Sequence, residues 1–265
     1  MSWEGHDAEI SRLVKTAGIR STPHLMAKSS AQTFPHTRWS VVLRLRAPGE
    51  AERRRAMSEL CVHYWRPLYT FARRCGHARE DAEDLTQGFL ARMVERGDIG
   101  DVSEERGRLR LFFKAAFRNF VTDQIRHAQR ERRGGKAEML SLDVASAERQ
   151  FEKNFSQSAT AEEAFDRHWA RTMLQRALTE LRKRFAARGR DKILSTLEVY
   201  LGAEGTGPPY ADAARSLGLS ENAVAAAVHR LRGEFQELLR AEVADTLAEG
   251  EDVEEELRYL LRALS

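Results

Sequence analysis

Apolar residues recur at steps of three and four along most of the chain from Thr37 onward, which is the spacing of one face of an α-helix. In the first half, the pattern predicts a helix that starts near Thr37 and three more over about 51–75, 79–95 and 108–132. Pro67 lies inside the second of these, and we expect it to break or kink that helix. Together these helices can bury one core, and the clearest apolar stripe consists of Leu109, Phe112, Phe113, Ala116, Phe117, Phe120 and Val121.

A second helical unit follows a stretch that has no clear periodicity. Its apolar stripes lie within 165–185 and 193–201, and two helices with a tight turn follow over 210–235. No segment is predicted to be a strand. We therefore predict an all-α fold of two small helical domains joined by a flexible linker. The expected bounds are 1–33 for a disordered lead-in, 34–135 for the first domain, 136–160 for the linker, 161–241 for the second domain and 242–265 for an acidic helical tail.

The composition indicates a globular protein with much hydrated surface. Of the 265 residues, 42% are hydrophobic and 31% are charged, which excludes wholesale disorder and a membrane-embedded protein. The chain has no uninterrupted apolar stretch of the ~18 residues that a membrane span needs, and no secretory signal is visible. Because there are only two cysteines, Cys61 and Cys75, a disulfide scaffold is excluded as well. We expect a cytoplasmic protein without membrane insertion.

The net charge of +3 conceals two segments of opposite charge. Between Arg106 and Lys136, ten basic residues stand against two acidic ones, a local charge of +8, whereas the segment from Glu242 to Arg258 carries −7. A concentrated basic segment is typical of nucleic-acid binding, although a solvated helix face is the alternative. Five of its cations recur in steps of four or eight and predict a basic ridge along one helix, which can neutralise a row of phosphates. These cations are Arg110, Lys114, Arg118, Arg126 and Arg130. The aromatic residues opposite this ridge are spaced for core packing rather than for base stacking.

The second half contains the spacing of a helix-turn-helix. Ala214 allows two helices to approach, Gly218 suits a left-handed turn, and Val224 packs the second helix on the first. Ser220 is placed to cap that second helix. The outward positions, which can enter a major groove, are Asn222, Ala226, His229, Arg230 and Gly233. An ordinary helical hairpin is the alternative interpretation.

The sequence does not support a metal site or a catalytic motif. Four residues are of types that bind zinc: Cys61, His63, Cys75 and His77. On a continuous helix, however, the two cysteines would lie ~21 Å apart at ~1.5 Å per residue. The acids between Glu80 and Asp84 suit a helix N-terminus or a partner-binding face better than a metal. The chain has no HExxH or GxSxG motif. We therefore expect no enzyme, no metal and no cofactor.

Three stretches resemble bacterial sigma-70-type factors. DAEDLTQGF over 81–89 and NFVTDQIR over 119–126 look like their domain two, and YADAARSLGLSENAVAAAVHRLR over 210–232 looks like their domain four. The motifs occur in the correct order without a domain three, as in the extracytoplasmic-function group. FPHTRWSVV over 34–42, RGGKAEMLSLD over 133–143 and EEELRYLLRALS over 254–265 are similar to a longer branch of that group.

The resemblance implies roles for matching positions. Asp81, Asp84, Leu85 and Gln87 would bind the clamp helices of core RNA polymerase. Asn119, Asp123 and Arg126 match the helix that faces the minus-ten promoter element, and the helix bearing Asn222, His229 and Arg230 would read the minus-thirty-five element. Ala225 departs from the branch, where Lys is expected. The implied partners are core polymerase and promoter DNA, and an anti-sigma factor is compatible with the resemblance.

Alternatives remain for the whole chain and for its tail. A helix-turn-helix regulator that acts without polymerase, or a helical adaptor related to anti-sigma proteins, would share several of these features. The acidic 81–87 face disfavours the first and the basic ridge disfavours the second. After a break at Gly250, residues 254–264 are predicted to form a short amphipathic helix. That helix would either pack on the second domain or cover the basic ridge and compete with DNA.

Overall fold

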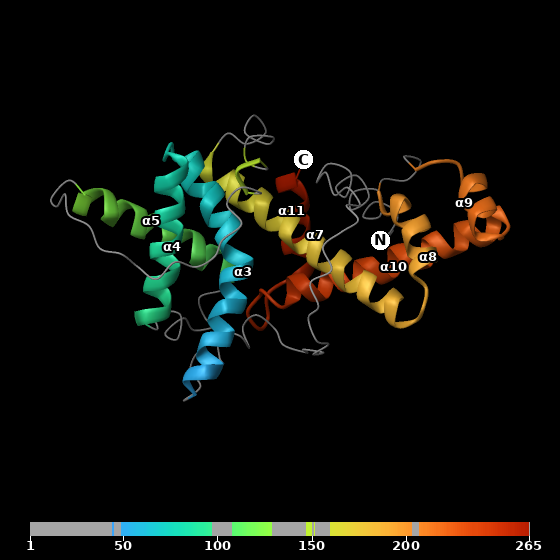
Figure 1. Cartoon of the computed structure of the whole chain (residues 1–265), viewed down its shortest axis with the longest axis horizontal. Coiled ribbons are helices and arrows are strands. Elements are labelled where there is room, and N and C mark those ends of the chain that lie inside the picture. The colour runs from blue at the N-terminus through green and yellow to red at the C-terminus, as the bar shows by residue number, and fades with distance from the viewer. Residues whose placement is uncertain are drawn as a thin grey trace. The chain divides into compact units, whose positions relative to one another are not determined.

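The structure is a computed structural model that describes residues 44, 49–96, 108–128, 147–149, 151, 160–202 and 207–264 (Figure 1). The lead-in, most of the expected first helix, Arg130 and most of the expected linker lie outside these residues. The described residues contain helices and turns and no strand, so the predicted all-α fold is confirmed. The helices are α3 (Glu50–Arg74), α4 (Arg79–Arg96), α5 (Leu109–Ala128), α7 (Ala161–Ala187), α8 (Asp191–Leu197), the 3₁₀ helix η3 (Glu198–Leu201), α9 (Tyr210–Leu217), α10 (Glu221–Ala244) and α11 (Val253–Leu264).

Contacts divide the chain into two compact units. The N-terminal unit comprises the described residues up to Trp169 together with Asp245–Asp252, and the C-terminal unit comprises Ala170–Ala244 and α11. The division falls inside α7, whereas the sequence pattern assigned that whole helix to the second domain. A 3.6-residue period shows that one face of a helix is buried, but it does not show which core covers that face.

Aromatic side chains form the core of the N-terminal unit. Tyr64 of α3 stacks on Phe113 of α5 with ring centroids 3.7 Å apart, and on Trp169 of α7 at 4.7 Å. Phe89 of α4 meets Phe117 of α5 edge to face at 5.1 Å. These buried rings confirm that the α5 aromatic stripe packs in the core.

Of the two effects expected of Pro67, a break or a kink, the break does not occur. Helix α3 continues through this residue from Glu50 to Arg74. A proline inside a helix costs about 3 kcal/mol, because its N–H is missing and its ring crowds the preceding turn. The side chains on either side of it, Tyr64 and Leu68, are fully buried, and their packing offsets that cost.

The C-terminal unit contains the expected pair of helices. α9 ends at Gly218, which adopts the left-handed conformation with φ 67°, and α10 follows after a short turn. The Ser220 hydroxyl accepts a hydrogen bond from the Ala223 N–H at 3.2 Å, so the predicted cap is present. The buried face of α10 includes Val224, Val228, Leu231 and Phe235.

The tail contains the expected amphipathic helix, α11, preceded by Gly250 at φ 86°. α11 packs against α10, and Arg240 of α10 donates to Glu254 at 2.6 Å. The first of the two interpretations of the tail, packing on the second domain, thus agrees with the observed contacts of α11. Its buried leucines are Leu257, Leu260, Leu261 and Leu264. Among the described residues, no helix has both the length and the apolar character that crossing a membrane requires.

Candidate nucleic-acid and polymerase interface

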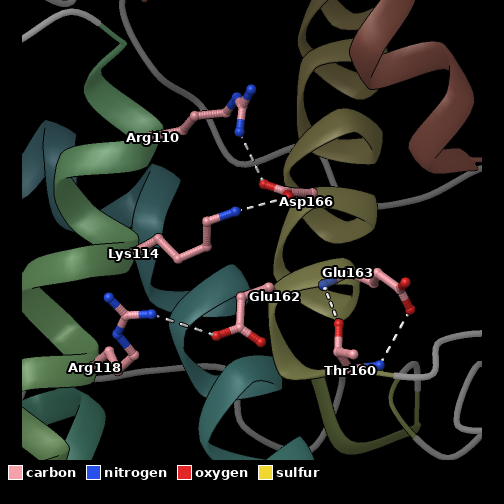
Figure 2. A network of polar contacts seen from close by, with 7 residues as sticks. All are labelled: Arg110, Lys114, Arg118, Thr160, Glu162, Glu163 and Asp166. Carbon is pink, nitrogen blue, oxygen red and sulfur yellow. Dashed lines mark hydrogen bonds and ion pairs between the residues drawn. The ribbon is translucent and has the colours of Figure 1, made fainter.

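The first two cations of the predicted ridge contact an acid of α7. Arg110 donates to Asp166 at 3.2 Å, and Lys114 donates to the second carboxylate oxygen of Asp166 at 2.8 Å (Figure 2). The side chains of Arg110 and Asp166 are only 2% and 4% exposed. Charges that are buried this deeply need partners, because desolvation strongly disfavours an isolated ion. In this structure, Arg110 and Lys114 therefore serve as counter-ions inside the N-terminal unit.

The middle of α5 presents its polar side chains to solvent. The side chain of Arg118 is 61% exposed and lies 3.9 Å from Glu162, in the first turn of α7. Asn119 and Asp123, which the sigma-factor resemblance singles out, are exposed on the same helix. Arg126 belongs to α5, but its side chain and the whole of Arg130 lie outside the described part of the chain. Their predicted contacts with DNA stay predictions.

Helix α4 presents part of the expected polymerase face. Asp81 and Asp84 are exposed, and Leu85 is half-buried rather than fully inward. Gln87 does not project as expected: it is buried, and its amide donates to Glu83 at 3.2 Å. The three-residue spacing placed Gln87 beside Asp81 and Asp84, but it could not show that the amide turns back along its own helix.

Four of the five outward positions predicted on α10 are exposed, and the fifth, Gly233, is half-buried. Asn222, His229 and Arg230 are exposed. The other two arginines of α10 contact protein groups: Arg232 donates to the carbonyl of Tyr200 at 3.0 Å, and Arg240 pairs with Glu254. Arg230 forms no ion pair with any residue that the structure describes. It is therefore the cation of α10 that is available for a phosphate.

Sequence reasoning missed a buried polar cluster around Glu148. This residue lies in the stretch expected to be a linker, yet residues 147–149 and 151 are helical, and Ala147, Glu148 and Phe151 are buried. The Glu148 carboxylate accepts hydrogen bonds from Tyr69 and from Arg73, the latter at 2.6 and 3.1 Å. This stretch is too short for apolar residues at steps of three and four to signal a helix. No sequence feature marked Glu148 as the acid that pairs with Arg73.

The cluster shifts the pKa values of its members. Burial alone would raise the pKa of Glu148, but hydrogen bonds from Arg73 and Tyr69 outweigh burial, so this pKa lies below its ordinary value of 4.5. Burial, followed by the hydrogen bond to Glu148, raises the pKa of Tyr69. At neutral pH, Glu148 is therefore ionised and Tyr69 is a neutral donor.

We expect Glu148→Gln to lower the free energy of unfolding by about 1.5–3 kcal/mol at neutral pH, because it removes hydrogen bonds to a charged group. The folded-state pKa of Glu148 is depressed, so its ionised form stabilises the fold above the unfolded pKa of about 4.5 and this contribution is lost as the pH falls through the folded pKa. The difference between parent and variant should shrink on acidification below that pH. Urea unfolding followed by circular dichroism at several pH values measures it.

Glu249→Gln is the matched control for this experiment, because Glu249 is exposed. It should leave the free energy of unfolding within about 0.5 kcal/mol of the parent. A Glu148→Gln difference that stays constant from neutral to acidic pH would contradict the role of the ionised carboxylate.

Comparison with known families identifies the family of this chain. A family model described as ECF sigma factor matches residues 48–241. The chain belongs to the ECF sigma factor family. No curated protein and no solved structure matches the chain.

Membership of the ECF sigma factor family explains the order of the elements. The matched residues span α3 to α10, so they include the α4 and α5 motifs and the α9–α10 turn. The similarities noted over 34–42 and 254–265 lie outside the match. ECF sigma factors are regulatory, non-enzymatic proteins. Because sigma factors act in transcription initiation, the role of this chain is in that process.

Proposed function

We propose that this ECF sigma factor binds core RNA polymerase through the exposed acids of α4 and directs it to promoters through α5 and α10. The observation that supports the proposal most is that family-matching residues stand exposed on helices whose opposite faces are buried. Asp84 on α4, Asn119 on α5 and Asn222 on α10 are all exposed, whereas Phe89, Phe117 and Val224 on the same helices are buried.

The proposed division of labour follows from side-chain chemistry. Arg118 and Arg230 are exposed guanidinium groups suited to phosphate, and phosphate contacts position a protein on DNA without reading its sequence. Asn222 can form two hydrogen bonds to an adenine edge in the major groove. His229 lies on the same exposed face of α10, within reach of the next bases. The two helices would thus supply anchoring and readout together.

In vitro transcription with core polymerase and a library of promoter fragments tests the function. The full chain should produce transcripts from a subset of the fragments, and Asp84→Arg should lower both this output and the affinity for core polymerase by about tenfold or more, because charge reversal places like charges at a contact. Glu249→Arg makes the same charge change at an exposed acid outside α4 and should behave like the parent.

The outcome also separates the alternative functions. Promoter-selective DNA binding by the chain alone, with no effect of core polymerase, would favour a regulator that acts without polymerase. Equal polymerase affinity for Asp84→Arg and Glu249→Arg, at unchanged helical content, would remove Asp84 from the proposed contact.

A further inference from the structure

The start of α7 is held in a defined geometry. Thr160 accepts a hydrogen bond from the Glu163 N–H at 3.1 Å, and the Glu163 carboxylate accepts one from the Thr160 N–H at 3.1 Å (Figure 2). This reciprocal arrangement is a capping box, and it satisfies two backbone donors at the beginning of the helix. Because Glu163 turns back onto the cap, it does not face α5. Its neighbours Glu162 and Asp166 do face α5.

Asp166 forms a buried anchor between α7 and α5. Its two carboxylate oxygens take Arg110 and Lys114, and all three groups lie well inside the N-terminal unit. The adjacent Phe165 is fully buried, with Lys114 5.8 Å from the centre of its ring. Releasing this contact would expose an aromatic side chain and separate buried charges of opposite sign, so DNA does not compete for it.

Glu162 forms a contact of a different kind, one turn earlier. Its side chain is 45% exposed and lies 3.9 Å from the guanidinium of Arg118, which is itself more than half exposed. An exposed ion pair of this length contributes only about 0–1 kcal/mol. A DNA phosphate, which brings counterion release, can therefore replace Glu162 at Arg118 without disturbing the core.

We infer that the acidic first turns of α7 set the limit of the DNA-binding surface on α5: Asp166 withdraws Arg110 and Lys114 from it, and Glu162 competes with a DNA phosphate for Arg118. The inference rests on the proposed DNA-binding role of α5. Its consequence is weaker binding to DNA of any sequence, since each phosphate that reaches Arg118 must first displace a carboxylate. Promoter contacts made elsewhere then account for a larger share of the affinity.

The test measures binding of the full chain to a fluorescently labelled random-sequence duplex, between about 50 and 200 mM salt. Glu162→Gln should bind about two- to fivefold more tightly at the lowest salt, which corresponds to an exposed pair of up to about 1 kcal/mol. The gain should shrink as salt screens the competing charges. The log–log salt slope should become steeper, by up to about one unit.

Glu163→Gln is the matched control, because it removes the same charge from the next residue and glutamine can still complete the capping box. It should leave the affinity close to that of the parent. Equal gains for Glu162→Gln and Glu163→Gln would show an effect of net charge alone and would overturn the inference.

Arg118→Ala separates the inference from the proposed function. We expect it to weaken binding and to flatten the salt slope by about one unit, and we expect Glu162→Gln to have no further effect in that background. If Arg118→Ala weakens binding but Glu162→Gln alone does not strengthen it, the competition is refuted and the DNA contact stands. If Arg118→Ala changes nothing, both the DNA contact at Arg118 and the competition are refuted.

Discussion

Replacing Asp166 by alanine should lower the free energy of unfolding by about 3–5 kcal/mol, the usual cost of removing one partner of a buried ion pair. The variant leaves the Arg110 guanidinium buried, with the carboxylate that neutralised it removed. Lys114 loses the same partner at 2.8 Å. Urea unfolding of the full chain, followed by circular dichroism and by tryptophan fluorescence, measures the loss.

Glu162→Ala provides the comparison, because it removes an acid from the same helix and from the same row of ion pairs. Its partner Arg118 is exposed, so the expected loss is at most about 1 kcal/mol. Similar losses for the two variants would show that Asp166 is not a buried anchor. Rescue of Asp166→Ala by Arg110→Met would support the anchor, because it removes the buried charge that the first substitution deprives of its carboxylate.

Replacing Leu260 by alanine should lower the free energy of unfolding by about 2–5 kcal/mol, through the lost apolar contacts and the cavity left behind. Leu260 is buried in α11, which packs against α10, and a helix of this length has little stability alone in water. Arg262→Ala, at an exposed position of the same helix, should stay within about 0.5 kcal/mol of the parent.

This experiment also distinguishes the two interpretations of the acidic tail. If α11 served chiefly as a competitor of DNA, Leu260→Ala would increase DNA affinity and leave stability unchanged. If α11 is part of the C-terminal unit, the loss of stability comes first, and the variant should unfold at lower urea concentration.

The sequence was sufficient to predict most helices and the α9–α10 turn. Helical periodicity and capping are local properties, and Gly218 and Ser220 serve the turn as their chemistry suggests. The bounds of α4 agree with the prediction to within a residue. Positions whose role depends only on the periodicity of their own helix, such as Asp84 and Asn222, were therefore placed on the correct face.

Tertiary partners could not be predicted in the same way. Arg110 and Arg118 occupy equivalent places in one charge pattern, yet the first is buried against Asp166 and the second is exposed. Nothing in the periodicity of α5 distinguishes them, because the difference comes from a helix that starts more than forty residues later. For the same reason, the sequence did not reveal the role of Glu148. At Pro67, where a break or a kink was expected, the helix does not break, because packing outweighs local preference at that residue.

The segment Asp245–Asp252 determines when the N-terminal unit can finish folding during synthesis. Thr246 accepts a hydrogen bond from the Leu109 N–H at 3.2 Å, and Glu251 pairs with Arg108 across 143 residues of sequence. At translation rates of roughly 5–20 residues per second, the ribosome reaches Glu251 roughly 7–30 s after Arg108. The first turn of α5 therefore emerges long before its last partners, and a nascent chain stalled before residue 245 would lack the contacts that finish the N-terminal unit. Completion of that unit is in this way coupled to synthesis of the segment that follows α10.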